Sequence, residues 1–333
     1  MISSIFALAL CFLGNPPETS DLERYEATER HMGVVFNIVL YSESETKAKL
    51  GFEAAFDRID QLDRTMSDYD SDSELSRLSN SSPTSEPVKV SDDLWRVLVK
   101  SQDLSEKSDG AFDVTVGALT KLWRRARRQH ELPSEERLKE AMRAVGYRHL
   151  SLDCGTKSVS LGIPNMRLDL GGIAKGYAAD EALAALKTLG ISRALVNASG
   201  DIALGDSPPG KPGWKIGIAP LNPDTTPSRF LELSNCAVAT SGDAWQFVEV
   251  DGRRYSHIID PRTGLGLMER SSVTIVAPTC TDADGLASAV SVLGPKAGVD
   301  FVDKIPKTVA IVVRLTDDKP ETIESKSFSQ MTK

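Results

Sequence analysis

One histidine in the chain stands where its side chain could move a proton. The stretch SHIIDPRTG, residues 256–264, contains His257, one of four histidines in the sequence. A lone histidine in a strand is usually structural, but an ordinary pKa of about 6.5 lets the imidazole accept a proton near neutral pH. Alternation along RRYSHIID places His257 on the face opposite Ile258. His257 is therefore a candidate general base.

A glycine pair at a predicted strand-to-helix junction could bind an anion. In LDLGGIAKGYAADEA, residues 168–182, a short strand ends near Asp169, and Gly171 and Gly172 lead into an Ala-rich helix. The free N–H groups at a helix start favour an anion, and Lys175 adds a positive charge at that point. Neither GxGxxG nor the Walker spacing is present, and a plain strand-to-helix turn explains the glycines equally well.

The segment DADGLAS, residues 282–288, presents a carboxylate and a hydroxyl on one helix face. Asp284 and Ser288 are four residues apart, which is the spacing of neighbours on a helix surface. Oxygen ligands suit a hard cation such as Mg²⁺, which takes few protein ligands and completes its shell with water and substrate phosphate. Capping of the helix by Asp282 explains the same acids, and by itself is the more common arrangement.

Two further segments are rich in small hydroxyl residues. NASGD, residues 197–201, and ATSGD, residues 239–243, are both predicted to be turns after apolar strands. Such turns either join strands or present hydroxyls and backbone N–H groups to a ligand, and both interpretations stay open.

Hydrophobic periodicity predicts the elements that position these residues. Apolar residues at steps of three and four predict a long helix from Ala48 to Met66, and Ser91 and Ser134 are predicted to cap two more. The helix after Ser134 is expected to bury Leu138, Met142 and Val145. Strands are predicted at residues 34–41, 148–153, 158–161, 167–170, 194–197, 214–219, 230–233, 245–250, 254–259, 272–277 and 308–315, and a late helix at 282–293. Because these elements do not alternate regularly, the predicted fold class is α+β, with a mostly antiparallel sheet core and packed helices.

The overall charge argues against a nucleic-acid partner. The 333 residues carry a formal net charge of -8, whereas a phosphate backbone is bound mainly by clustered Lys and Arg. One basic run, KLWRRARRQH, extends from Lys121 to His130. A short basic run on a helix is usually a solvated face, and contact with an anionic partner or a membrane surface is favoured over nucleic acid.

The first residues resemble an export signal. MISSIFALALCFLGNPPETS has an apolar stretch from Ile5 to Leu13 and a polar spacer, without Lys or Arg in front. We expect residues 1–20 to direct export to the periplasmic side, with lipidation at Cys11 as a route to membrane anchoring. Residues 21–320 are predicted to form one domain, and the polar residues after Lys319 to fray, leaving 321–333 as a tail.

Taken together, these segments resemble the ApbE family of FAD:protein FMN transferases from about His31 to Val313. The motifs, in the order typical of that family, are HMGVVF, MSDYDSDSELSRL, DGAFDVTVGALTKLW, LDLGGIAKGYAAD, VNASGD, VATSGD, SHIIDPRTG and APTCTDADGLASA. The resemblance implies an ApbE-like, T-fold-like architecture. It also implies a protein that binds FAD and, with Mg²⁺ on the pyrophosphate, transfers FMN to a Thr or Ser hydroxyl of a target flavoprotein and releases AMP.

The resemblance also implies roles for individual residues. Contacts to FAD are carried onto Met32, Tyr69, Ala111, Phe112, Asp113, Asp169 and Lys175. Metal ligands are carried onto Gly172, Asp284 and Ser288, the base onto His257, and Asp260 is expected to orient the region. Val34, Ser199 and Ser288 depart from the Thr, Gly and Thr that the family usually has.

The implied acceptor is a membrane-associated or exported flavoprotein, such as a subunit of a respiratory complex. Two alternatives remain at this point. An Mg²⁺-dependent FAD pyrophosphatase would use the same site to hand FMN to water, and a non-catalytic FAD-binding protein would use only the flavin contacts.

Overall fold

The computed structural model describes residues 21–221, 225–242, 247–316 and 319–331. The predicted export segment, residues 1–20, lies outside these ranges, as do Asp243 and Trp245. Among the described residues, no helix is long and apolar enough to cross a membrane.

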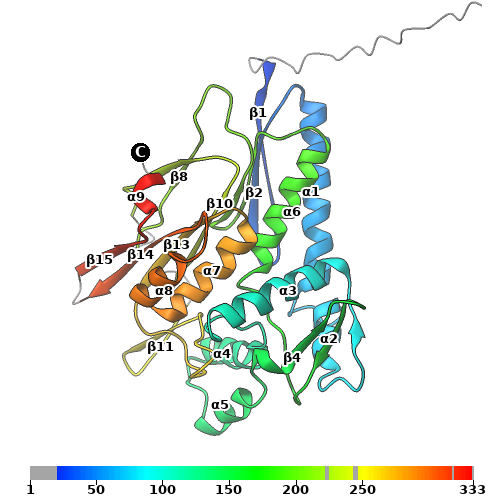
Figure 1. Ribbon diagram of the computed structural model, residues 1–333, viewed down its shortest axis with the longest axis vertical. Coiled ribbons are helices and arrows are strands. Elements are labelled where there is room, and N and C mark those ends of the chain that lie inside the picture. Colours follow the sequence, from blue (N-terminus) through cyan, green and yellow to red (C-terminus); the bar gives the residue numbers. More distant parts are fainter. Residues whose placement is uncertain (1–20, 222–224, 243–246, 317–318, 332–333) are drawn as a thin grey trace, which may run out of the picture.

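One antiparallel sheet forms the centre of the molecule (Figure 1). Its eight strands follow the order β1-β2-β6-β7-β10-β13-β14-β15, and each neighbouring pair is antiparallel. The strands are β1 Glu23–His31, β2 Val34–Ser42, β6 Ala194–Ala198, β7 Asp201–Leu204, β10 Ala237–Gly242, β13 Ser271–Ala277, β14 Val309–Thr316 and β15 Lys319–Glu324. The predicted α+β fold class with a mostly antiparallel core is confirmed.

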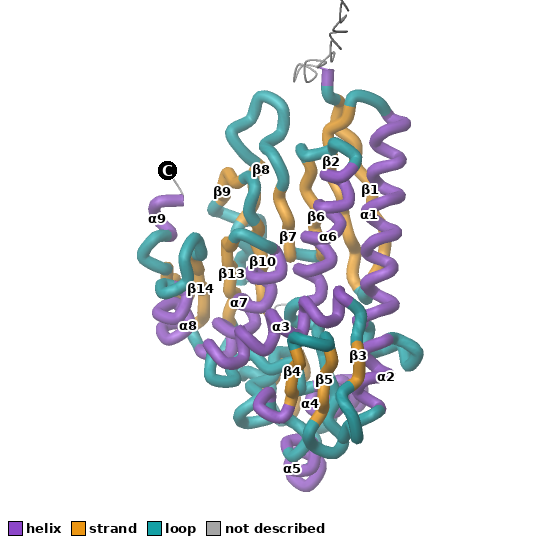
Figure 2. The backbone as a smooth tube through the Cα atoms, turned by 45° about the vertical axis from the view of Figure 1, so that its right-hand side comes forward, coloured by secondary structure: helices purple, strands orange, loops and turns teal. Residues whose placement is uncertain are grey.

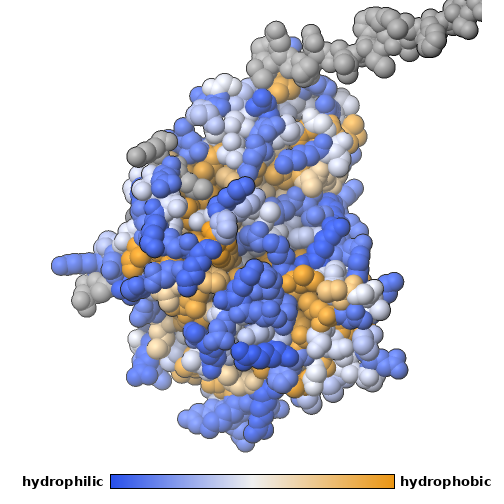
Figure 3. All heavy atoms as spheres, viewed as in Figure 1, coloured by the Kyte–Doolittle hydropathy of each residue, from blue (hydrophilic) through white to orange (hydrophobic). Residues whose placement is uncertain are grey.

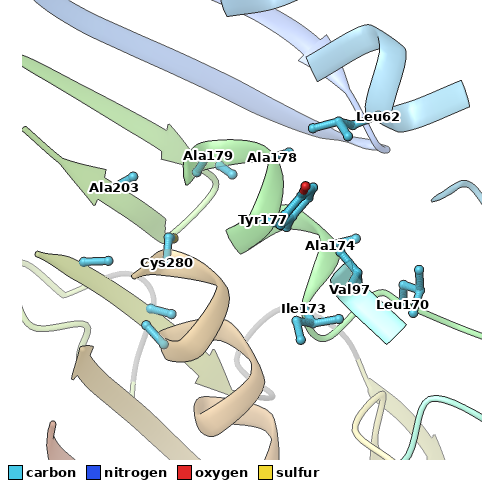
Figure 4. Close-up of a cluster of buried hydrophobic side chains, with 14 of the residues drawn as sticks. Leu62, Val97, Leu170, Ile173, Ala174, Tyr177, Ala178, Ala179, Ala203 and Cys280 are labelled. Atoms are coloured by element: carbon cyan, nitrogen blue, oxygen red, sulfur yellow. The ribbon is translucent and has the colours of Figure 1, made fainter. Parts of the chain in front are cut away.

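Helices α1, α6, α7 and α8 pack against the central sheet and cover one of its faces. The helices are α1 Glu45–Met66, α2 Glu74–Asn80, α3 Asp92–Lys107, α4 Gly117–Gln129, α5 Glu135–Met142, α6 Ala174–Thr188, α7 Cys280–Leu293, α8 Pro295–Val302 and α9 Phe328–Met331. Helix α6 lies beside α1, and α7 packs on β10 and β13 (Figure 2). Figure 4 shows α6 between Leu62 and Val97 on one side and Cys280 and Ala203 on the other. The alanines of α6 therefore form the centre of the core.

The predicted caps at Ser91 and Ser134, and a third at Ser44 that was not predicted, explain where three of these helices begin. Ser44, Ser91 and Ser134 accept hydrogen bonds from backbone N–H groups in the first turns of α1, α3 and α5. The prediction of a buried stripe on α5 is wrong, because α5 has no fully buried residue. Its apolar side chains are half-buried against the smaller apolar cluster around Trp123 and Tyr255.

The opposite face of the sheet is covered by β8 Trp214–Gly217, β9 Phe230–Leu233 and the chain end. Phe328 of α9 is fully buried in this second core. The prediction that the chain frays after Lys319 is wrong for residues 319–331, because β15 pairs with β14 and α9 packs against the sheet. The domain boundary predicted after residue 320 thus falls inside β15.

The remaining elements lie at the end of the molecule that carries α4 and α5 (Figure 2). They are the three-stranded sheet of β3 Val88–Lys89, β4 Leu150–Asp153 and β5 Ser158–Leu161, and the hairpin of β11 Phe247–Val250 and β12 Arg253–Ser256. The hairpin turns at Asp251 and Gly252, both with positive φ, as expected for a two-residue Asp-Gly turn.

Three predicted local structures differ from those observed. β12 ends at Ser256, so His257 follows the strand instead of lying within it. Residues 167–170 form no strand, because Arg167 makes only an isolated bridge to Val116. Of the predicted turn at residues 239–243, the described residues up to Gly242 belong to β10, which pairs with β13, and Asp243 lies outside the described ranges.

Candidate functional site

A close approach of two helices creates the buried part of the site. A Cβ atom at Gly176 would lie 2.2 Å from the backbone oxygen of Cys280 and 2.8 Å from Asp284 Cβ. Only glycine permits α6 and α7 to come this close. The contact lets the Gly176 backbone N–H donate to Asp284 Oδ2 at 3.0 Å and places the neighbouring Lys175 beside the same carboxylate.

Lys175 is bound between two buried aspartates. Its Nζ donates to Asp201 Oδ2 and lies 3.3 Å from Asp284 Oδ2. Burial lowers the pKa of Lys175, but the two carboxylates outweigh burial and raise it. Burial and the nearby Asp284 carboxylate raise the pKa of Asp201 to about 7, because one lysine must balance two acids. We call Lys175, Asp201 and Asp284 the lysine cluster.

The predicted metal ligands lie next to the lysine cluster. A Cβ atom at Gly172 would lie 2.8 Å from Ser288 Oγ and 3.4 Å from Phe112 Cε2, so the missing side chain lets this turn come close to the hydroxyl. Asp284 and Ser288 are one turn apart on α7. The described residues contain no metal-binding group of three or more His, Cys, Asp or Glu. A backbone carbonyl, one carboxylate and one hydroxyl fit Mg²⁺, which needs few protein ligands.

The alternative explanation of the late helix, capping by Asp282, is wrong. The α7 N-cap is Thr279, whose hydroxyl accepts from the Asp282 backbone N–H at 3.1 Å. Asp180 of α6 also binds this helix start by accepting from the backbone N–H groups of Cys280 and Thr281 at 2.8 Å. The cap is formed without Asp284. The Asp284 carboxylate instead accepts from the Gly176 backbone N–H and lies beside Lys175.

A second cluster of charges lies around Arg124 of α4. The Arg124 guanidinium forms ion pairs with Asp68 and with Asp169, the latter at 3.0 Å. The same group lies 4.1 Å from the centre of the Tyr69 ring, within cation–π distance. Tyr69 is 77% exposed and offers a free ring face to a planar ligand. We call Arg124, Asp68, Asp169 and Tyr69 the arginine cluster.

Asp169 connects the two clusters. Its Oδ1 accepts from the Gly171 backbone N–H at 2.8 Å, while its Oδ2 faces Arg124. The turn that carries Gly172 is therefore fixed by the same carboxylate that Arg124 binds. The structure thus brings together Tyr69, Asp169, Gly172 and Lys175 along one path from the surface into the core.

The predicted FAD contacts in the DGAFD segment are buried. Ala111 and Phe112 are buried, and the aromatic ring of Phe112 lies beside the Gly172 turn. Both carboxylate oxygens of Asp113 are engaged, because Thr115 N and Tyr147 N donate to them at 2.7 Å and 2.9 Å. Burial raises the pKa of Asp113. Asp113 therefore organises the loop, and its contact with FAD stays a prediction.

Met32 lies at the turn between β1 and β2, where its φ is 51°. Its backbone N–H donates to Asp63 Oδ2 at 2.7 Å, which connects this turn to the end of α1. The Met32 side chain is half-buried against the main hydrophobic core. Its role toward the flavin stays a prediction.

His257 lies on a loop attached to α4 and not to the central sheet. The Trp123 Nε1 donates to the Gly264 carbonyl at 2.7 Å, and the Trp123 and Tyr255 ring centres are 5.3 Å apart. Asp260 accepts from the backbone N–H of Arg262 at 2.9 Å and pairs with its guanidinium, so it organises the turn as expected. His257 itself is half-buried. Its role as a base stays a prediction.

Sequence reasoning missed three charged residues of these clusters. The segment NASGD contains Asp201, and MSDYDSDSELSRL contains Asp68, but neither segment by itself predicts a role for its aspartate. Arg124 was interpreted as part of a solvated basic face, whereas its side chain is only 20% exposed. Arg124 lies three residues before Arg127 and directly after the buried Trp123, which places it on the flank of the helix. This spacing was the signal in the sequence that Arg124 is partly buried.

This α+β fold collects a lysine, carboxylates and a glycine turn at one helix junction, as expected of a protein that binds an anion together with a hard cation. The family model of the ApbE family matches residues 32–313. The chain belongs to the ApbE family, and the resemblance seen in its motifs is confirmed.

Relatives and solved structures agree with this assignment. The FAD:protein FMN transferase of Haemophilus influenzae is 35% identical over 277 residues, covering 80% of this chain and 79% of that protein. That of Vibrio cholerae is 35% identical over 303 residues, covering 89% of each. The solved structure of the flavin transferase ApbE from Vibrio cholerae has a TM-score of 0.83 and 31% identity, covering 93% of this chain and 99% of that chain.

Proposed function

We propose that this chain transfers FMN from FAD to a Thr or Ser hydroxyl of a target flavoprotein in a Mg²⁺-dependent reaction. The acceptor oxygen forms a bond to the phosphorus of the FMN half. The bond between that phosphorus and the bridging oxygen breaks, and AMP leaves with the bridging oxygen. Membership of the ApbE family and relatives named FAD:protein FMN transferases support this class of enzyme.

The lysine cluster beside the Gly172 turn is the observation that supports this proposal most. Gly172 lets its turn come close to the Ser288 hydroxyl, where a Cβ atom would lie 2.8 Å from Ser288 Oγ, and Asp284 lies one turn earlier on the same helix. Gly172, Asp284 and Ser288 would hold Mg²⁺, which when bound supplies charge neutralisation to the pyrophosphate. Lys175 lies at the same place between Asp201 and Asp284, so the lysine cluster has an excess of negative charge that suits the cation.

The arginine cluster would hold the other end of FAD. The exposed ring of Tyr69 provides a stacking surface for the isoalloxazine, and Arg124 beneath it fixes the ring position. Arg124 also balances Asp68 and Asp169, which would otherwise repel an anionic dinucleotide. Met32, Ala111, Phe112 and Asp113 complete the proposed set of FAD contacts.

His257 would accept the proton of the acceptor hydroxyl. It stands on an irregular loop whose position is set by α4, by the turn at Asp260 and by α7, whose Val292 carbonyl accepts from Arg262. A base on a loop can meet a protein substrate that arrives from outside, whereas a base within the core cannot. The expected order of events is FAD binding, acceptor docking and then proton transfer to the His257 imidazole.

Intact mass of a candidate acceptor domain tests the proposal directly. After incubation with this chain, FAD and Mg²⁺, we expect a mass gain equal to one FMN and an equal amount of AMP. Replacement of the acceptor Thr or Ser should abolish the gain. AMP and free FMN without a modified acceptor would instead favour the FAD pyrophosphatase, which uses the same residues with water in place of the hydroxyl.

Replacement of His257 separates binding from catalysis. We expect His257→Ala to retain FAD affinity and to lower transfer by at least about a hundredfold, the lower range for removal of a general base. Flavin fluorescence titration measures the affinity, and the intact-mass assay measures the transfer. Normal transfer by this variant would remove His257 from the mechanism.

Chelation tests the metal assignment. We expect EDTA to stop AMP release, and added Mg²⁺ to restore it in the wild type but only weakly in Asp284→Ala. The variant removes the single carboxylate of the proposed ligand set. Full activity in EDTA would contradict the metal site, and the control is a chain dialysed without chelator.

We also propose that the acceptor is a membrane-associated or exported flavoprotein and that the chain acts after export to the periplasmic side. The apolar stretch at residues 5–13 supports export. Fractionation of cells that express the full chain, with and without residues 1–20, tests this proposal. Retention of the full chain in the cytoplasm would contradict it.

A further inference from the structure

The exposed face of α4 has a charge pattern that the proposed catalytic roles do not use. At 3.6 residues per turn, Lys121, Arg125 and Arg128 fall on one face of the helix, opposite the buried Trp123. All three are exposed, and α4 contains no acidic residue. We call these three residues the α4 stripe.

Several other helices pair an exposed base with an acid one turn away, whereas α4 contains no such pair. The acid stands four residues before the base in α1, α3 and α5, as in Lys49–Glu45 and Lys107–Asp103, and four residues after it in α8, in Lys296–Asp300. Across the described ranges, the α4 stripe has no ion pair, and Arg125 only donates to Gln129 Oε1. Like charges four residues apart destabilise a helix by about 0.2–0.5 kcal/mol per pair. A bound acidic partner would remove this repulsion.

The buried side of α4 connects the stripe to both halves of the proposed site. Trp123 donates to the Gly264 carbonyl of the loop that carries His257, and Arg124 binds Asp169 beside Tyr69. The stripe therefore lies on the helix from which the flavin contacts and the base loop are both positioned. A molecule bound along the stripe is placed beside the site.

We propose that the α4 stripe binds an acidic segment of the acceptor flavoprotein, next to the Thr or Ser that receives FMN. This inference rests on the proposed function. Because the whole chain has a net charge of -8, most of its surface repels an acidic segment, and a local cationic stripe orients the encounter. Hydrophilic side chains cover the end of the molecule at α5, next to α4 (Figure 3), which suits a polar contact.

A membrane surface fits the stripe less well than a protein segment does. Helices that bind in the membrane interface combine basic residues with large apolar residues that insert between lipids. The large apolar residues of α4 face inward, since Leu119 and Trp123 are buried in the protein. The helix thus offers charge without an insertion surface.

Two matched peptides test this inference. Both contain the same central Thr and a fluorophore, with Asp and Glu as flanking residues in one and Asn and Gln in the other. We expect the wild type to bind the acidic peptide roughly tenfold more tightly at low salt, as measured by fluorescence anisotropy. The difference should shrink as NaCl is added, because screening weakens contacts between exposed charges.

Charge reversal identifies the surface responsible. The variant Lys121→Glu/Arg125→Glu/Arg128→Glu should bind the two peptides equally. The matched control, Lys49→Glu/Lys296→Glu/Lys326→Glu, changes the net charge equally at exposed lysines on other elements and should keep the preference. FAD binding, measured by flavin fluorescence titration, should persist in both variants, which shows that the site is intact.

The outcomes separate this inference from the proposed function. Equal binding of the two peptides by the wild type, or a preference kept by the stripe variant, would overturn the inference. Stripe-dependent binding to phosphatidylglycerol vesicles without any peptide preference would assign the stripe to a membrane and also overturn it. A stripe-dependent peptide preference in a wild type that releases no AMP would support the docking surface and contradict the proposed function.

Discussion

The lysine cluster and the arginine cluster have the same charge composition and different surroundings. Each contains one cation between two aspartates that come from separate segments of the chain. In the lysine cluster, Asp201 and Asp284 are 6% exposed and Lys175 is 24% exposed. In the arginine cluster, Asp169 is 8% exposed, Arg124 and Asp68 are each 20% exposed, and Tyr69 is 77% exposed. Water therefore reaches the arginine cluster mainly at Asp68 and Tyr69, while both carboxylates of the lysine cluster are largely shielded from it.

This difference shows how burial decides what a set of charges can do. In the lysine cluster, each charge depends on the others, so a metal ion or a pyrophosphate that enters must rearrange the existing pairs. In the arginine cluster, the planar guanidinium can bind carboxylates and stack on a ring at once, which suits positioning. The lysine cluster suits the neutralisation of charge during the reaction, and the arginine cluster suits the orientation of the ligand.

Removal of the Lys175 ammonium group from the lysine cluster should have the largest effect. We expect Lys175→Met to destabilise the metal-free protein by about 3–5 kcal/mol at pH 8, because two buried carboxylates lose their partner. Urea unfolding measures the change, and Lys187→Met, at an exposed position on the same helix, is the control. A loss below about 1 kcal/mol would mean that the ion pairs of the lysine cluster contribute as little to stability as ion pairs on the protein surface.

The raised pKa of Asp201 predicts how stability changes with pH. Its pKa is about 7 in the native state against an ordinary 3.8, so the native state retains a proton that the unfolded state releases. This contribution to stability is present below pH 3.8 and is lost as the pH rises to about 7. Urea unfolding of the wild type should show this decline, and Asp201→Asn should show a smaller one. Equal pH slopes would contradict the shift.

Removal of the Arg124 guanidinium from the arginine cluster should act on ligand binding more than on stability. We expect Arg124→Ala to weaken FAD binding by roughly tenfold, about 1.4 kcal/mol, with a smaller cost to folding. Arg124→Lys should be intermediate, because it keeps the charge and loses the planar group. Flavin fluorescence titration measures the affinity, with Arg137→Ala of α5 as the control. A large loss of stability without an affinity change would reverse the roles of the clusters.

Much of the fold could be predicted because its signals are local. The apolar spacing and the serine cap of α1 specify a helix without reference to the rest of the chain. The strand β15 was missed because its sequence, KPETIE, is polar, and its pairing with β14 decides its conformation. The apolar pair after His257 suggested a longer strand, but the β12 pairing ends at Ser256.

The candidate site could be predicted only as far as its motifs reach. Asp284 and Ser288 share a helix face, so their spacing was informative. The contact of Lys175 with Asp284 spans 109 residues and depends on the close packing that Gly176 permits. Arg124 was missed because a basic run does not show which of its members turns inward. Contacts between distant segments are set by packing, which sequence spacing does not record.

The hairpin of β11 and β12 is a separate two-stranded sheet, outside the eight strands of the centre. A hairpin alone has little stability in water, and this one is supported by contact with α4. We therefore expect its backbone amides to exchange with solvent deuterium through brief local openings, while those of β13 exchange only when the whole molecule unfolds. We also expect the start of the loop that carries His257, which directly follows β12, to open together with the hairpin.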